Sequence, residues 1–180
     1  MEKAGRTYLY GTEVSAIHAS SEFAIRRPIK YGNLAITNAY NALACTEDLQ
    51  RILEGAITDK MGLKIDKLKN FSVVIVIQDS FVRHHVRHLL NMLFIKMGFK
   101  AAFVHVEAVM ATYAMAAQTA CIVDIGSTKT SVCCVDDGVI VNKTIIKKHY
   151  GGDDISELLY RFFRAKDSLH YFPQNVFYPL

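Results

Sequence analysis

The sequence lacks any apolar run that approaches the roughly 20 residues needed to cross a bilayer. Its densest apolar stretches, residues 73–77 and 101–106, have the length of a β-strand. The first six residues are polar and lead to no apolar signal core, so secretion is not expected. We therefore expect an intracellular protein with no membrane partner.

Proline, glycine and cysteine are also scarce. Of 180 residues only three are proline and ten are glycine, while 51% are hydrophobic and 21% are charged. This composition argues against a disordered, collagen-like or low-complexity chain and suits a packed globular core. The four cysteines (Cys45, Cys121, Cys133 and Cys134) show no C-x-x-C spacing, which disfavours a zinc site or a redox motif and indicates reduced thiols.

Positive charge is in slight excess, at a net +4, and this alone implies no nucleic-acid partner. The distribution is more informative, because residues 60–100 contain eight Lys or Arg against two Asp. Within this segment Arg83 and Arg87 lie one helical turn apart, where they can meet DNA phosphates or form an ordinary solvated face. His84 and His88 share that spacing, but no third ligand is suitably placed, so a zinc site is not expected.

Residues 47–117 alternate between helix and strand patterns. Thr46 is the predicted N-cap of the first helix and Gly62 its C-cap. The β-branched runs predict strands that are covered on both faces. The predicted elements are a helix over 47–60, a strand over 71–77, a helix over 82–97, a strand over 101–106 and a helix over 107–117. This alternation predicts an α/β protein with a parallel sheet.

The pattern changes at Thr119, where short β-rich segments begin. They cover 120–125, 130–135 and 139–146, and the short turns between them predict an antiparallel meander. A glycine pair at 151–152 then introduces a helix with an apolar stripe. We therefore expect one lobe over 1–118, the start of a second lobe (a β-meander plus a helix) over 119–165, and a disordered or divergent tail over 166–180.

The most informative motif is the turn over 124–129, with the sequence Asp-Ile-Gly-Ser-Thr-Lys between two predicted strands. A glycine-containing turn of this kind can point successive backbone N–H groups into a concavity that holds phosphate oxygens. Asp124 at the strand end can hold a metal ion through water. The plainer interpretation is an ordinary hairpin with a polar turn.

Five segments together resemble the actin superfamily and, within it, the nuclear actin-related proteins. They are residues 27–34, 104–114, 124–126, 129–139 and 150–155. The third and fifth resemble the second phosphate loop and the later glycine segment beside the nucleotide. The fourth is the most specific, and it is similar to the actin-related protein eight class, whose members serve in a nuclear chromatin-remodelling complex.

The resemblance implies an actin-like (RNase H-like) ATPase fold in which two lobes close on ATP and magnesium. It covers the end of the first lobe and the start of the second. The residues that it assigns to the cofactor are Asp124 (also to magnesium, through water), Gly126, Ser127, Thr128, Lys129, Gly151 and Gly152. The first phosphate loop and the adenine-contacting half are missing from the sequence, so we expect this chain alone not to bind ATP.

Two positions depart from the actin pattern. Ser127 stands where actin has a second aspartate, which removes one carboxylate from the outer shell of the metal. Glu107 stands where actin has its water-orienting glutamine, and a glutamate can still accept a proton from water. Alternatively, Glu107 is simply an acidic residue at the start of a helix, where the macrodipole favours it.

Three functional hypotheses follow from the resemblance. The first is a non-catalytic subunit of a nuclear chromatin-remodelling complex, which binds actin, other actin-related proteins and nucleosomes or DNA in transcription regulation and DNA repair. The second is an ATPase or phosphotransferase of the actin, chaperone and sugar-kinase superfamily, in which Glu107 orients water. The third is a truncated isoform without independent function.

Overall fold

The computed structural model describes residues 8–16 and 24–165. The tail predicted over 166–180 lies outside the described residues. In chain order the elements are η1 (Gly11–Ala16), β1 (Ile29–Lys30), β2 (Asn33–Leu34), α1 (Ala42–Met61), η2 (Ile65–Asn70), β3 (Ser72–Ile77), α2 (Arg83–Asn91), η3 (Met92–Lys96), β4 (Ala101–Val106), α3 (Glu107–Ala114), β5 (Thr119–Ile125), β6 (Thr130–Asp136), β7 (Val139–Ile140), η4 (Asn142–Thr144), β8 (Ile146–Lys148) and α4 (Gly152–Ala165). No helix among the described residues combines the length and the apolar character that a membrane crossing requires.

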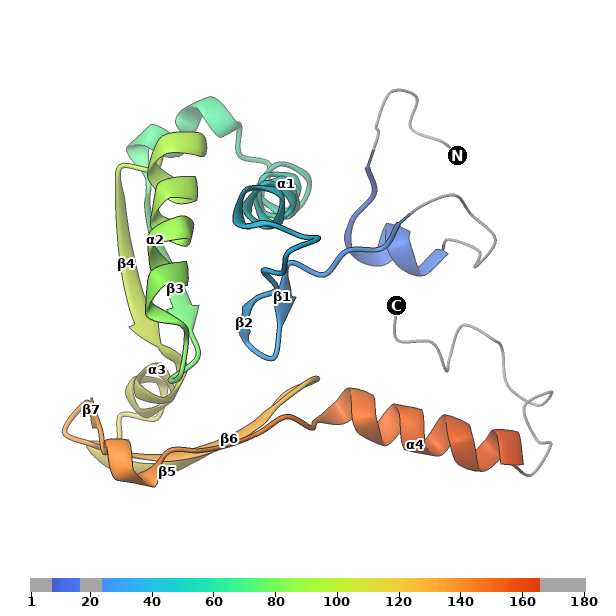
Figure 1. The fold of residues 1–180 in the computed structure, drawn as a ribbon. Coiled ribbons are helices and arrows are strands. Elements are labelled where there is room, and N and C mark those ends of the chain that lie inside the picture. Colours follow the sequence, from blue (N-terminus) through green and yellow to red (C-terminus); the bar gives the residue numbers. More distant parts are fainter. Residues whose placement is uncertain (1–7, 17–23, 166–180) are drawn as a thin grey trace.

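The predicted α/β unit is confirmed. Strands β3 and β4 pair in parallel, in a register that places Ser72 opposite Ala101 and Ile77 opposite Val106. Helix α2 and the π-helical turn η3 connect these strands, and Figure 1 shows α1 beside them on the same side of the sheet. The core between these elements contains Leu34, Cys45, Leu68, Leu89, Met92, Leu93 and Met97.

Helix α1 is longer than its prediction at the N-terminal end. Asn41, rather than Thr46, is its N-cap, and the Asn41 side chain accepts a hydrogen bond from the N–H of Ala44 at 2.9 Å. The Thr46 hydroxyl instead donates to the carbonyl of Ala42, one turn earlier in the helix. The predicted C-cap is confirmed, since Gly62 adopts a left-handed φ of 67°.

The expectation that the β-branched strands are covered on both faces is wrong for β4, where Phe103 is 59% exposed, and for β3. Its side chains alternate between a packed face and a face on which Val74 is 57% and Val76 49% exposed. The reason is that α1 and η3 pack against only one face of this two-stranded sheet. The adjacent helix α3 is also shorter than predicted, because it ends at Ala114 and Ala116 adopts a φ of 51°.

The predicted antiparallel meander is confirmed, with one correction. Strand β6 pairs with β5, β7 and β8, and Asp137-Gly138 forms the turn before β7 with positive φ at both residues. The third predicted segment, 139–146, is not one strand, because the turn η4 interrupts it between β7 and β8. A second small core holds α3 against β6 through Ala108, Val109, Cys133 and Val135.

Helix α4 begins at Gly152, as the glycine pair predicts. Figure 1 shows it continuing outward from the end of the β5–β6 hairpin. Its apolar stripe remains in water in this structure, since Ile155 is 67% and Phe162 is 60% exposed. The first lobe and the second lobe predicted on either side of residue 118 correspond to separate sheets, and the lobe boundary itself stays a prediction.

Candidate functional site

The site is organised by the turn that connects β5 to β6. The N–H of Gly126 donates to the carbonyl of Lys129 at 2.9 Å and closes the turn. The next three backbone N–H groups, those of Ser127, Thr128 and Lys129, donate to no other group in the described part of the chain. Successive amides left open in a tight turn are the arrangement that binds anions, phosphate above all.

The start of α4 packs directly onto this turn. The N–H groups of Gly152 and Asp153 donate to the carbonyls of Gly126 and Ser127 at 3.0 and 2.9 Å. A methyl group at Gly151 would lie only 2.3 Å from the oxygen of Gly126. Gly151 therefore holds the turn in place through close backbone packing and Gly152 through its hydrogen bond, and the amides of both are already engaged.

Three side chains from distant segments converge beneath the turn. Lys129 Nζ donates to Asp124 Oδ2 at 2.7 Å and to Glu107 Oε1, and it lies 3.4 Å from the Ser131 hydroxyl. Glu107 is the first residue of α3 and Asp124 lies near the end of β5, so the lysine joins the two sheets. Only 9% of the Lys129 side chain is exposed, compared with 30% for Glu107 and 40% for Asp124.

The environment keeps Lys129 charged. Burial alone would lower the pKa of its ammonium, but hydrogen bonds and Coulombic attraction from Asp124 and Glu107 outweigh burial and raise the pKa above its usual value. The pKa of Lys147, on β8, is shifted in the opposite direction. Its pKa is lowered, mainly by burial and then by repulsion from Lys129. Lys129 is thus the cation that the two carboxylates stabilise.

The resemblance implies ATP with magnesium as the cofactor, and the site suits the phosphate groups of ATP better than it suits the magnesium ion. The open amides of the turn suit phosphate oxygens. Asp124, the carboxylate assigned to magnesium, already accepts from Lys129, as does Glu107. The Ser127 hydroxyl donates to Asp153 at 2.6 Å. Among the described residues no three His, Cys, Asp or Glu side chains gather in a way that could hold a metal ion.

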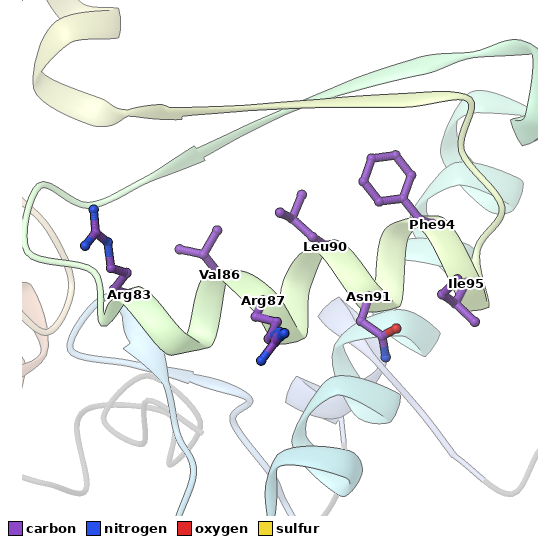
Figure 2. Close-up of a pocket in the computed structure, with 7 residues that line it drawn as sticks. All are labelled: Arg83, Val86, Arg87, Leu90, Asn91, Phe94 and Ile95. Atoms are coloured by element: carbon purple, nitrogen blue, oxygen red, sulfur yellow. The ribbon is translucent and has the colours of Figure 1, made fainter.

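The candidate DNA-contact residues lie elsewhere, on α2. Arg83 and Arg87 are exposed and form no ion pair within the described residues. They border an open groove of about 640 Å³ that Figure 2 shows along the helix. In this view Arg83 projects to the same side of α2 as Val86, Leu90 and Phe94. Arg87 projects to the other side, with Asn91 and Ile95, so the two arginines do not form one continuous basic face.

Two residues near these sites were missed by the sequence analysis. His85 lies in the buried face of α2 with its Nδ1 unpartnered, and burial followed by repulsion from His84 and His88 lowers its pKa. Asp79 follows β3 and accepts from the N–H of Ala108 at 3.3 Å and from the Cys133 thiol at 3.6 Å. Its position shortly after the β-branched run of β3 was the signal that could have identified it.

The Cys133 thiol is held in its protonated form by this surrounding. Burial first, and then the charge of Asp79, raise its pKa to about 11. Asp79 thereby ties the start of α3 to the meander, on the same side of the molecule as Glu107.

A parallel β–α–β unit leading through a short helix into an antiparallel meander, with an open phosphate-type turn at its first hairpin, is the arrangement of the actin-like ATPase fold. The family model described as Actin matches residues 2–178. The chain belongs to the actin family, and its relatives place it with actin-related proteins of class 8.

The similarity extends over most of the chain but only part of each relative. Human actin-related protein 8 is 37% identical over 155 residues, which are 85% of this chain and 25% of the human protein. Actin-related protein 9 of Oryza sativa subsp. indica is 30% identical over 158 residues, 88% of this chain and 27% of the rice protein. The chain therefore spans about a quarter of the length of these curated relatives.

A solved structure shows the same fold. "Human actin-related protein Arp8 in its ATP-bound state" matches with a TM-score of 0.77 and 35% identity. The match covers 83% of this chain and 30% of the human one. The predicted actin-like architecture is thus confirmed for the part of the fold that this chain represents.

Proposed function

We propose that this chain belongs to a non-catalytic actin-related subunit of a nuclear chromatin-remodelling complex, which holds a nucleotide as a structural element. The observation that carries the proposal is the state of the phosphate turn. Its three amides remain open, while Lys129 covers both Glu107 and Asp124, the two carboxylates that a hydrolytic site would need free. A site of this kind favours binding over turnover.

In this proposal the turn between β5 and β6 contacts the phosphate groups of the nucleotide. The amides of Ser127, Thr128 and Lys129 would hold phosphate oxygens, and the glycine contacts between Gly126 and Gly151 would keep the turn rigid. ATP would supply the anionic groups that link this turn to the other lobe. The support from similarity is that the matching human structure is described as ATP-bound.

The partners proposed are actin, other actin-related proteins and further remodeller subunits, with nucleosomal DNA contacted through Arg83 and Arg87. Both guanidinium groups are exposed and unpaired within the described part of the chain, so they are available to phosphates. A nuclear location and roles in transcription and DNA repair follow from this assignment.

The DNA contact is tested by nucleosomal binding across a salt series with the full-length protein. For an Arg83→Ala/Arg87→Ala variant we expect weaker binding and a salt slope that is smaller by about 2, roughly one per lost phosphate contact. The matched control is Lys64→Ala/Lys69→Ala, which removes the same charge from the connector around η2. Equal behaviour of the arginine variant and the wild type would remove α2 from the DNA interface.

A further inference from the structure

The Lys129 ammonium occupies the place between two carboxylates that a divalent cation occupies in many phosphate sites. Nζ contacts Asp124 at 2.7 Å and Glu107 within hydrogen-bond reach, and the Ser131 hydroxyl lies at 3.4 Å. An ammonium has three N–H donors and no acceptor, so these three oxygens match its full donor capacity. The side chain is therefore held by residues of three elements, α3, β5 and β6.

The geometry also fixes where this charge lies relative to the phosphate turn. Lys129 is the last residue of the turn, so its backbone N–H is one of the three open amides, while its ammonium contacts Asp124 and Glu107. The same residue thus supplies a donor to the concavity and a positive charge behind it. The open amides are the groups that bind phosphate, and the ammonium lowers the negative charge that Asp124 and Glu107 would otherwise present to it.

We propose that Lys129 is a tethered cation that replaces the divalent metal ion in this site, so that the phosphate groups of a nucleotide bind here without magnesium. This inference deepens the proposed function and rests on it for the identity of the ligand. It assigns Lys129 as a binding residue whose partners, Glu107 and Asp124, serve to hold the ammonium and not to orient water.

The charge balance of the site supports this assignment. Two carboxylates would carry two negative charges, and the ammonium leaves one. The neighbouring cation is Lys147, whose amine donates to the carbonyl of Tyr31 at 2.9 Å and whose pKa is lowered in part by repulsion from Lys129. A divalent ion placed beside these groups would have to displace the ammonium or lie against it. Like charges within about 4–6 Å disfavour each other strongly, typically by tenfold or more in binding.

The test measures Mn²⁺ binding to the protein without any nucleotide, by water-proton relaxation and by the shift in melting temperature. We expect the wild type to bind no Mn²⁺ at this site. For Lys129→Met, which keeps the length of the side chain and removes its charge, we expect Mn²⁺ affinity to rise at least about tenfold, because the two carboxylates are released. The melting temperature of that variant should rise with Mn²⁺ concentration.

The matched control is Lys147→Met, which removes a neighbouring positive charge and leaves the Lys129 contacts intact. We expect its Mn²⁺ affinity to stay near that of the wild type. An equal gain in both variants would overturn the proposal, because it would show a general charge effect. No gain in folded Lys129→Met would overturn it as well.

A second measurement keeps the proposal testable if Lys129→Met does not fold. Wild-type protein is titrated with Mn²⁺ alongside Asp124→Asn. Binding by the wild type that Asp124→Asn abolishes would overturn the proposal, since a metal would then occupy the site despite Lys129. These outcomes leave the DNA-binding and subunit assignments untouched, because those depend on α2 and on assembly, so the two sets of claims can fail separately.

Discussion

Gly151 lies where α4 meets the phosphate turn, at a point too narrow for any side chain. A methyl group there would sit 2.3 Å from Gly126 O and 2.6 Å from Ser127 O, and both contacts are to backbone atoms that cannot rotate away. For Gly151→Ala we expect the start of α4 to loosen by about 1–3 kcal/mol, the usual cost of overpacking. Hydrogen exchange at the amides of Gly152 and Asp153 measures this.

The neighbouring glycine provides the control. A methyl group at Gly152 would meet nothing closer than 3.9 Å, so Gly152→Ala should change the exchange of Asp153 by less than about 0.5 kcal/mol in free-energy terms. Equal loosening by both substitutions would contradict the packing described for the turn.

His85 gives the stability of the chain a pH dependence. Its folded-state pKa is lowered by burial and then by His84 and His88, so the unfolded chain takes up a proton at higher pH than the folded chain does. The contribution of neutral His85 to the free energy of unfolding is fully present above the unfolded-state pKa of about 6.5. It is lost as the pH falls through the folded-state pKa of His85. We expect the free energy of unfolding to decrease over that window.

The measurement is urea unfolding at a series of pH values, with an NMR titration of the histidine side chains. His85→Leu should flatten the dependence, whereas His84→Leu, at an exposed position of the same helix, should leave most of it. A pH profile that His84→Leu removes and His85→Leu leaves intact would show that the wrong histidine has been assigned.

The resemblance predicted which residues form the site, and that assignment stays a prediction, whereas the contacts among these residues were not predicted. The phosphate resemblance identified Lys129 and Asp124 from one short motif. Their joint contact with Glu107 depends on how the start of α3 and the turn between β5 and β6 meet, since Glu107 and Lys129 lie 22 residues apart in the chain. No local pattern encodes that distance, so the ion pair was visible only in the structure.

At the scale of elements, the register of β5 against β6 places Cys121 opposite Cys134. The bonds Gly126 N–H to Lys129 O and Asp137 N–H to Gln118 O close the two ends of this ladder. Along an antiparallel ladder, opposite residues alternate between hydrogen-bonded and non-hydrogen-bonded pairs. Counting from either end makes Cys121–Cys134 a non-hydrogen-bonded pair, in which the Cα atoms lie about 4.5 Å apart. The side-chain hydrogen bond of Cys121 with Cys134, followed by the Coulombic effect of Cys134, raises the pKa of Cys121.

This pair should form a cross-strand disulfide on mild oxidation, because its Cα separation lies in the range that disulfides accept. Hydrogen peroxide would take two electrons and two protons from the thiols and leave water. Peptide mapping by mass spectrometry should find Cys121 linked to Cys134. Cys134→Ser should abolish the link. Cys133→Ser should leave it in place, because Cys133 is buried on the other face of the sheet. A disulfide between Cys121 and Cys133 would contradict the register.

The sequence predicted the type and order of most elements, and missed where they end. Apolar periodicity and β-branched runs indicated α1, β3, α2, β4 and the meander, because those signals are local. The start of α1 at Ala42 was missed because its cap, Asn41, precedes the apolar stripe. The break at η4 was missed because Thr144 accepts from the N–H of Cys134 on the neighbouring strand, a tertiary contact without a sequence signature.

At the scale of the whole molecule, the structure presents apolar faces that a complete actin-like fold would cover with further elements. Phe103 on β4, Ile125 on β5 and the stripe of α4 are all largely exposed. The sequence predicted this partial character from the missing first phosphate loop. Nucleotide binding is therefore proposed for a two-lobed protein, in which the first phosphate loop of the family can face residues 127–129.

The two principal hypotheses differ in what happens to a bound nucleotide. If Lys129 is the resident cation, Glu107 is occupied and ATP persists. If Glu107 orients water, ATP is converted to ADP at a rate that depends on this carboxylate. The arrangement of Lys129 between Glu107 and Asp124 favours the first outcome.

The most direct test is phosphate release by the full-length protein, isolated from its partners and supplied with ATP and Mg²⁺, with the bound nucleotide identified after denaturation. We predict that ATP is recovered intact and that wild type and Glu107→Ala release phosphate at the same background rate. A wild-type rate that falls by about 100-fold or more in Glu107→Ala would contradict the account, because general-base assistance of that size requires a free carboxylate.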